Sequence, residues 1–323
     1  MRQIAIAVSA ATAVALASPA SAADAKDAKS ATKIVAAKTI FGAEKTPAPL
    51  AARSIGFYSR GCLAGGHAIP IDGNNWQVMR LSRNRNWGHP RLLALIKRLA
   101  RDGAAKDGWP GLLIGDISQP RGGPMLTGHA SHQIGLDADI WLTPMPGRRL
   151  TKAERENLSA ISMLGPDKIH VDPAKFSARH AAIIMRAASY PQVERVFVHP
   201  GIKKALCEIK GIDHTNLHKV RPYWGHHYHM HIRITCPPGS PSCRPQAATP
   251  HDDGCGKEIN DWIALLQRPP PPPKPGPKRK PKPPITLADL PAECQAVVTA
   301  GKHGKSHLEA AAPTKGKAHA QSR

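Results

Sequence analysis

The chain has 323 residues and a formal net charge of +22. Such a basic balance is typical of proteins that meet an anionic partner, such as cell wall, a membrane surface or nucleic acid, although a need for solubility alone would also explain it. No apolar run reaches the length of a membrane-spanning helix, so we expect no transmembrane segment.

The first residues have the pattern of a secretory signal peptide. Arg2 precedes an apolar run at 4–17, and an Ala-Ser-Ala cleavage site follows. We therefore expect residues 1–22 to be removed after Ala22 and the mature protein to reach the periplasm. A nucleic-acid partner is disfavoured, because export removes the chain from that target.

A single folded domain is predicted over residues 48–267. Residues 23–47 are rich in alanine and lysine and are expected to form a flexible leader. From Ser54 onward apolar and aromatic residues recur, which marks the beginning of a hydrophobic core. The predicted span lies within the usual size range of one domain.

The elements of this domain follow from hydrophobic periodicity. Helices are predicted at 91–102, 177–190, 202–209 and 261–267, and one more begins with a capping box of Thr151 and Glu154. Strands are predicted at 111–118, 137–142, 193–200 and 223–236. Because helices and strands mix without regular alternation, we predict an α+β fold with a small antiparallel central sheet flanked by helices.

The C-terminal region divides into three segments. Residues 268–284 form a Pro/Lys-rich spacer, in which ten of the sixteen residues 269–284 are proline, as in semi-rigid polyproline. We favour a plain spacer over a wall-binding or partner-binding role. Residues 285–299 are too few to fold alone, and we expect a disulfide through Cys294 to dock them. Residues 300–323 form a basic tail that we expect to be disordered.

Six cysteines fit an exported chain: Cys62, Cys207, Cys236, Cys243, Cys255 and Cys294. Their even number predicts up to three disulfides, whose connectivity the count leaves open. A zinc–thiolate site is disfavoured, because the chain has no C-x-x-C pair and its histidines cluster elsewhere.

The stretch HASHQIGLDADIW, residues 129–141, places ligand-type side chains in an apparent core strand. On an extended run Asp137 and Asp139 share one face. A carboxylate on the face of a central strand costs several kcal/mol unless it is paired or bound to a metal. Taken alone, Asp139 would be interpreted as a salt-bridged or capping residue.

A second stretch, WGHHYHMHIRI at residues 224–234, carries histidines in an alternating pattern. His229 and His231 face one side of the extended run, while Met230 and Ile232 face the other. Two histidines aimed at one point are typical of a divalent metal site. The alternative, an exposed metal-affinity tract, fits poorly with the apolar β pattern around them.

Together, the two stretches supply His132, Asp139 and His231 as a His₂Asp set. Such a set leaves a fourth tetrahedral position for water, as catalytic zinc sites do. Zinc lowers the pKa of bound water and polarises a carbonyl group. His229 lies on the same strand face and is placed to accept the proton.

The motif H-x₆-D followed by H-x-H resembles the zinc peptidases grouped around lysostaphin, the D-Ala-D-Ala peptidases and the hedgehog domain. The wider chain, roughly Ser54 to Ile263, resembles the penicillin-insensitive murein endopeptidase family. The segments that carry this resemblance are SIGFYSRGCLAGG, WQVMRLSRNRNWGHP, GDISQPRGGPM, HASHQIGLDADIWL and WGHHYHMHIRI.

The resemblance implies roles for individual residues. The zinc ligands would be His132, Asp139 and His231. His229 would be the catalytic base or a transition-state stabiliser, and His226 would help to stabilise the oxyanion. One zinc ion per chain is expected.

The resemblance also implies a second metal position. Its ligands would be His129, Asp167 and His170. The alternatives are a hydrogen-bonding role beside the first site for His129 and an ordinary loop pair for the other two.

The cysteine pairing that the resemblance implies is Cys62–Cys294, Cys207–Cys255 and Cys236–Cys243. The first of these would join the segment after the spacer to the start of the domain. The spacer and the basic tail depart from the family and put the C-terminal boundary in doubt.

Some further polar residues have two interpretations. His89 and His199, each followed by proline, are expected to be structural. The run RLSRNR at 80–85 supplies Arg80, Arg83 and Arg85, which could bind substrate carboxylates or pair with acids of the domain. We expect at least two of these three arginines to be structural.

The sequence therefore predicts a periplasmic zinc endopeptidase that hydrolyses peptide cross-links of peptidoglycan at the D-alanyl–meso-diaminopimelyl bond. With no serine nucleophile, it would be insensitive to β-lactams. The alternatives are a zinc carboxypeptidase of the D-Ala-D-Ala type and a non-catalytic, metal-containing wall-binding module. Cross-link preference, metal count and oligomeric state stay open.

Overall fold

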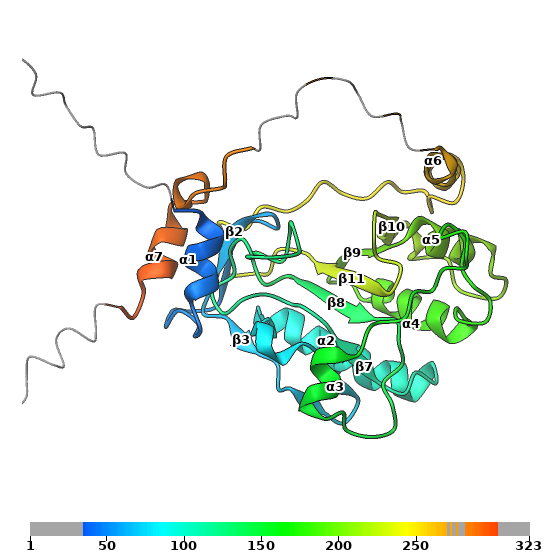
Figure 1. Cartoon of the computed structure of the whole chain (residues 1–323), viewed down its shortest axis with the longest axis horizontal. Coiled ribbons are helices and arrows are strands. Elements are labelled where there is room, and N and C mark those ends of the chain that lie inside the picture. The colour runs from blue at the N-terminus through cyan, green and yellow to red at the C-terminus, as the bar shows by residue number, and fades with distance from the viewer. Residues whose placement is uncertain (1–34, 270–271, 273–275, 277–281, 303–323) are drawn as a thin grey trace, which may run out of the picture. The chain divides into compact units, whose positions relative to one another are not determined.

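The computed structural model describes residues 35–269, 272, 276 and 282–302 (Figure 1). The predicted signal peptide, the first part of the leader (23–34), much of the spacer and nearly all of the tail lie outside these residues. The described part combines α-helices with mixed sheets, which confirms the α+β prediction. Its helices are all too short or too polar to cross a membrane.

A seven-stranded sheet forms the centre of the described fold (Figure 1). Its strands in spatial order are β10 (Val220–Pro222), β9 (Val193–Val198), β11 (His229–Ile234), β8 (Asp137–Trp141), β7 (Leu112–Ile114), β5 (Trp76–Val78) and β4 (Asp72–Gly73). The pairs β10–β9 and β5–β7 are parallel and the others antiparallel. The sheet is thus larger than predicted and mixed, because its edge strands are too short to show a period.

The register of β8 and β11 decides which side chains meet. His231 pairs with Asp139, and Arg233 pairs with Asp137. Since side chains alternate along a strand, these residues share one face of the sheet. The intervening residues of the two strands point into the main hydrophobic core: Ala138, Ile140, Met230 and Ile232.

Two long helices, α2 (Pro90–Lys106) and α4 (Ala178–Ser189), bury their apolar faces in the same core. The side chain of His89 accepts a hydrogen bond from the Arg91 amide at the start of α2, with Pro90 at the first helical position. His199 caps α5 (Pro200–Glu208) in the same way. Both histidines are therefore structural, as expected.

The helix with the predicted capping box, α3, is short. It spans Lys152–Asn157, with Thr151 and Glu154 forming the box. Leu158 then takes an extended conformation, and the guanidinium of Arg80 donates to carbonyls at this helix end. These bonds satisfy groups that an ending helix leaves unpaired.

A smaller layer corrects the boundary of the leader. Helix α1 (Ala37–Ala43) lies beside α7 (Glu293–Thr299) and the hairpin of β1 (Arg53–Phe57) and β2 (Arg60–Ala64) (Figure 1). Phe41 is fully buried there. The predicted flexible leader therefore ends before residue 37, because this apolar face of α1 has a partner.

The remaining small sheet pairs β3 (His67–Ala68) with β6 (Trp87–Gly88).

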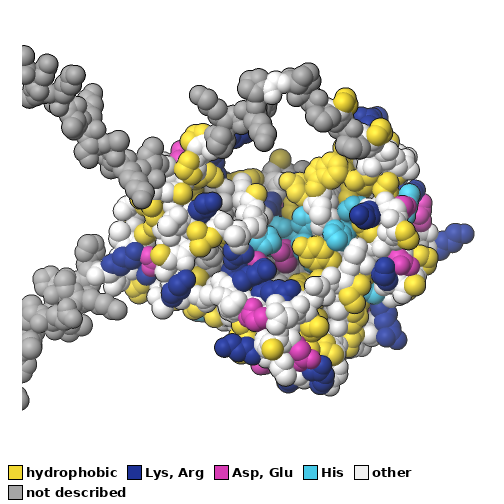
Figure 2. All heavy atoms as spheres, viewed as in Figure 1, with side chains coloured by type: hydrophobic (Ala, Val, Ile, Leu, Met, Phe, Trp, Pro, Cys, Tyr) yellow, Lys and Arg dark blue, Asp and Glu magenta, His cyan; other side chains and the backbone are white. Residues whose placement is uncertain are grey.

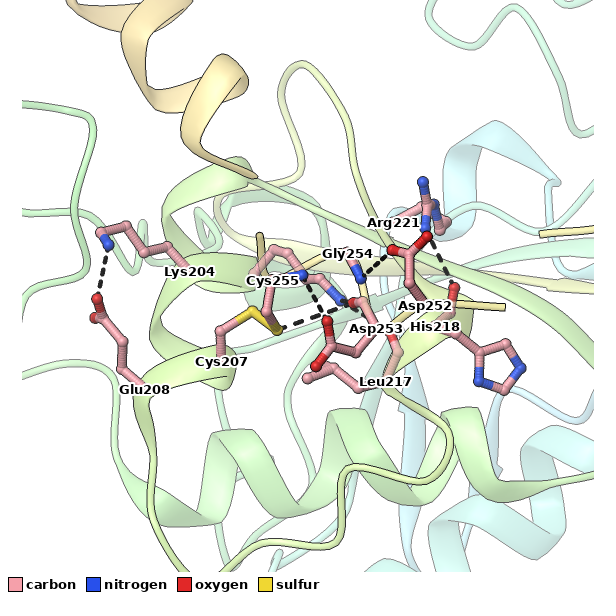
Figure 3. The surroundings of a disulfide bond; sticks show 11 residues. Lys204, Cys207, Glu208, Leu217, His218, Arg221, Asp252, Asp253, Gly254 and Cys255 are labelled. Atoms are coloured by element: carbon pink, nitrogen blue, oxygen red, sulfur yellow. Dashed lines mark hydrogen bonds and ion pairs between the residues drawn. A yellow bond between two sulfur atoms is a disulfide. The ribbon is translucent and has the colours of Figure 1, made fainter. Parts of the chain in front are cut away.

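All three implied disulfides are present. Cys62–Cys294 joins β2 to α7, where the buried Arg121 also donates to the carbonyls of Val297 and Val298. Cys207–Cys255 joins α5 to the segment before α6 (Lys257–Gln267), beside Asp253 and Leu217 (Figure 3). Cys236–Cys243 closes a short loop after β11.

Candidate metal site

The three predicted ligands come together beside the middle of β8, which carries Asp139, and of β11, which carries His231. His132 Nε2 lies 3.4 Å from Asp139 Oδ1, and His231 Nδ1 lies 3.8 Å from the same oxygen. His132 has a left-handed backbone with φ of 66°, which turns its ring back toward β8. All three side chains are buried.

Hydrogen bonds fix the orientation of both imidazoles. His132 Nδ1 donates to the carbonyl of Ile117 over 2.6 Å, and His231 Nε2 donates to Asp137 Oδ1 over 2.8 Å. Carbonyl and carboxylate oxygens only accept, so these ring nitrogens carry the protons. The lone pairs of His132 Nε2 and His231 Nδ1 are thus left facing Asp139, as in metal-ligating histidines held by an outer partner.

Two side-chain atoms of the predicted ligands lack hydrogen-bond partners in the described part of the chain. Within the described residues, His132 Nε2 and Asp139 Oδ1 are buried without a hydrogen-bond partner. Leaving such groups unsatisfied costs about 1–3 kcal/mol each. Two ligands of a tetrahedral zinc ion lie about 3.3 Å apart, given bond lengths of about 2.0–2.1 Å. The donor set therefore fits a divalent cation that takes nitrogen and oxygen ligands.

The charges around the site agree with this interpretation. Burial acts to lower the pKa of His132, but the carboxylate of Asp139 outweighs it and raises that pKa to about 9. Burial acts to raise the pKa of Asp137, but Arg233 and His231 hold it well below its usual range. Both carboxylates thus favour a positive charge between the imidazoles, which a cation would supply.

Two further histidines line the site. His229 Nε2 lies 3.5 Å from Asp139 Oδ1, and burial lowers the pKa of His229 to about 4, so its ring is neutral at neutral pH. The His226 ring lies 4.8 Å from the His229 ring, between centroids. His226 Nδ1 donates to the carbonyl of Trp224 over 2.7 Å, so its neutral ring presents a lone pair at Nε2.

His129 belongs to this cluster too. Its Nε2 lies 3.0 Å from Asp116 Oδ2 and 3.5 Å from Asp139 Oδ2, and it groups with His132 and Asp139 as ligand-type side chains. Asp116 and Asp137 are the contacts for which the sequence assigned no role. Asp137 was marked only by its two-residue spacing from Asp139. Asp116 follows an apolar strand and has no sequence signal of its own.

Among the described residues, neither Asp167 nor His170 forms a hydrogen bond or ion pair with His129. His170 Nδ1 is 2.7 Å from Asp167 Oδ2, and this carboxylate also accepts from two backbone amides. Both side chains are about half exposed. They form a pair with each other on their loop.

Two cavities are lined by predicted zinc ligands. One, of about 290 Å³, is lined by Asp139, His229 and His129 together with Arg83 and Tyr228. The other, of about 340 Å³, is lined by His231, His226 and His129 together with Tyr223 and Arg233. Figure 2 shows the histidines gathered in the middle of this face, next to acidic and basic side chains.

The fold and site define an α+β domain with a candidate divalent-metal centre open to a cleft. Comparison with known proteins agrees with the resemblance drawn from the motifs. The chain belongs to the family described as penicillin-insensitive murein endopeptidase, which matches residues 54–299. It is accordingly a hydrolase of the peptidase class.

Named relatives cover most of the chain. A Haemophilus influenzae protein named penicillin-insensitive murein endopeptidase is 44% identical over 214 residues, which are 66% of this chain and 73% of the relative. Proteins of the same name from Salmonella paratyphi A and Salmonella typhi are each 41% identical over 252 residues, 78% of this chain and 88% of the relative.

Proposed function

We propose that the protein is an exported zinc endopeptidase that hydrolyses the D-alanyl–meso-diaminopimelyl cross-links of peptidoglycan. The relatives are named for cleavage of murein. The donor set of His132, Asp139 and His231 suits zinc. A bound cation would satisfy His132 Nε2 and Asp139 Oδ1, which are buried without a hydrogen-bond partner among the residues that the structure describes.

The observation that carries this proposal is the placement of the donor set between two cavities. Asp139 and His229 line one cavity, and His231 and His226 line the other. An endopeptidase must hold peptide on both sides of the scissile bond. A carboxypeptidase needs room for only a single residue on the leaving side, so the pair of cavities favours the endopeptidase.

The chain's own residues divide the chemical work. His132, Asp139 and His231 would hold the ion, which when bound supplies electrophilic activation of the scissile carbonyl and of a water molecule. His229, neutral at neutral pH, takes a proton from the attacking water and delivers it to the leaving amine.

The role proposed for His226, stabilising the oxyanion, requires a proton on Nε2. The Nδ1–H of His226 already donates a hydrogen bond to the Trp224 carbonyl. Burial lowers the pKa of His226, so its ring would have to take up a proton from solvent as negative charge develops on the substrate. For His129 we propose a hydrogen-bonding role, because a second ion would require Asp167 and His170 to leave each other.

Export and β-lactam insensitivity complete the proposal. Three disulfides suit an oxidising compartment such as the periplasm. β-Lactams inactivate enzymes by acylating a nucleophile, and the proposed chemistry uses water instead.

The test is product analysis by mass spectrometry on purified cross-linked muropeptide dimers. Mature protein with zinc should convert dimers to monomers, while a chelator or His229→Ala should abolish conversion. His67→Ala, which changes an exposed histidine on β3, is the matched control and should remain active. Loss of terminal D-Ala from intact dimers would favour the carboxypeptidase. Unchanged dimers in all samples, despite bound zinc, would favour a wall-binding module.

A further inference from the structure

The three arginines of the RLSRNR run have different surroundings. Arg80 donates to carbonyls at the end of α3 and lies 5.5 Å from the centroid of the Trp141 ring. Arg85 is 8% exposed and donates to Asp116 over 2.8 Å and to the Thr127 carbonyl over 3.0 Å. Both are structural, as expected for two of the three.

Arg83 differs from them. Its side chain is 46% exposed, and its one hydrogen bond in the described structure runs from Nη1 to Asp116 Oδ2 over 3.1 Å. That oxygen already accepts from Arg85 and lies 3.0 Å from His129 Nε2. Because Asp116 is already paired with Arg85, it does not need the positive charge of Arg83. Most of the guanidinium donors of Arg83 remain available.

The backbone holds Arg83 in place. It ends a 3₁₀ turn (Leu81–Arg83) flanked by Arg80 and Asn84, whose φ angles are 55° and 51°. Ser82 donates to the Glu156 carboxylate through its amide and its hydroxyl, and Asn84 Oδ1 accepts from Trp87 Nε1. A strained turn held on both sides is typical of a residue fixed for a ligand.

The position of Arg83 relates it to the proposed chemistry. It lines the same cavity as Asp139 and His229, together with the exposed Tyr228. His229, the proposed proton donor to the leaving amine, lines this cavity and not the other. The Arg83 cavity is therefore the side that receives the leaving amine.

Resting on the proposed function, we propose that Arg83 binds the free carboxylate carried by the same carbon as the leaving amine. In the proposed cross-link this is the carboxylate of the diaminopimelyl centre whose nitrogen forms the scissile amide. A guanidinium binds a carboxylate through two parallel hydrogen bonds. Arg83 is thus a specificity-determining residue.

The experiment pairs a change in the enzyme with a change in the substrate. Two purified dimers are compared, one with this carboxylate free and one with it converted to the carboxamide. We expect the wild-type protein to prefer the free carboxylate by about tenfold to hundredfold in kcat/KM, the loss typical of a charge-assisted hydrogen bond. The Arg83→Gln variant should cleave both dimers at about the rate at which the wild-type protein cleaves the carboxamide dimer.

Controls separate recognition from folding. Arg83→Lys keeps the charge without the fork and should retain part of the preference. Arg91→Gln, which removes an exposed charge on α2, should retain all of it. Zinc content and thermal unfolding are measured for each variant.

Each outcome bears on the proposal. Equal wild-type cleavage of the two dimers would overturn the role of Arg83 while leaving the endopeptidase intact. A preference that persists in Arg83→Gln, or an equal loss on both dimers, would also overturn it, the second by showing a role in supporting Asp116. Wild-type protein that cleaves neither dimer would refute the proposed function and this inference with it.

Discussion

His231 and Asp139 are register partners across β11 and β8, and His231 Nδ1 lies 3.8 Å from Asp139 Oδ1. The pairing is antiparallel, and it brings together two strands that are far apart in the sequence. Behind His231, Asp137 accepts the proton of Nε2 and leaves the Nδ1 lone pair directed at the site. Strand pairing therefore sets both the position and the tautomer of a proposed ligand.

Asp139→Asn should abolish stoichiometric zinc binding. The change removes the carboxylate that faces His132 Nε2 and His231 Nδ1, together with its charge. Zinc measured by mass spectrometry after dialysis should fall from about one ion per chain to near zero. Asp167→Asn is the control and should keep the full zinc content. Loss of one of two ions in the control would instead reveal a second metal position.

Asp137→Asn should weaken zinc binding without removing a ligand. It replaces the acceptor for His231 Nε2, and such outer partners typically contribute 10-fold to 100-fold in metal affinity, as an order of magnitude. It also leaves Arg233 buried without its carboxylate, 2.7 Å from Nε, at a cost of about 3–5 kcal/mol. Competition with a zinc chelator and urea unfolding measure the two effects. Unchanged zinc affinity would mean that Asp137 serves Arg233 alone.

The sequence predicted the two strand faces but not all of their neighbours. Period-two alternation placed Asp137 with Asp139 and His229 with His231, because that rule is local. The approach of Asp116 and Arg85 to His129 depends on the packing of separate segments, which no local pattern encodes. Helix α1 has seven residues, too few for a clear period, and packing against α7 decides its burial.

The family resemblance gave what local patterns could not. The three disulfide pairs join residues up to 232 positions apart, and the count of cysteines left their pairing open. By contrast, the edge strands β4 and β10 and the neighbouring β5 were missed, because they have two or three residues each. Their pairing is set by neighbouring strands and not by their own composition.

Stability should depend on pH through Asp102, which lies on α2 far from the metal site. Its carboxylate accepts from the Tyr190 hydroxyl over 2.9 Å and from Arg98 over 3.3 Å. Burial acts to raise the pKa of Asp102, but these bonds outweigh it and lower the pKa below the ordinary 3.8. The unfolded state therefore binds the proton more readily, so this stabilisation is full above pH 3.8 and is lost as pH falls through the folded pKa.

The comparison of wild type with Asp102→Asn tests this sign. With solvent screening the ion pairs of Asp102 with Arg98 and Arg101, we expect wild type to be more stable by about 1 kcal/mol at pH 7 and at pH 5. The difference should shrink as pH falls below 3.8 and through the folded pKa of Asp102. Urea unfolding is measured with chelator in all samples, so that metal binding does not contribute. A difference that stays constant down to pH 2 would contradict the assignment.

Removal of the Cys62–Cys294 disulfide should undock the segment at 285–299 and leave the metal site intact. The bond closes a loop of 232 residues, and the double variant Cys62→Ser/Cys294→Ser should lose about 2–5 kcal/mol of stability. Arg121 still binds the end of α7, so undocking is partial and should appear as faster trypsin cleavage near α7. Zinc content should not change, because the ligands lie on and beside β8 and β11. The Cys236–Cys243 disulfide closes a loop of only 7 residues, so the variant Cys236→Ser/Cys243→Ser should lose less stability. Equal trypsin resistance in wild type and the first variant would show that packing alone docks the segment.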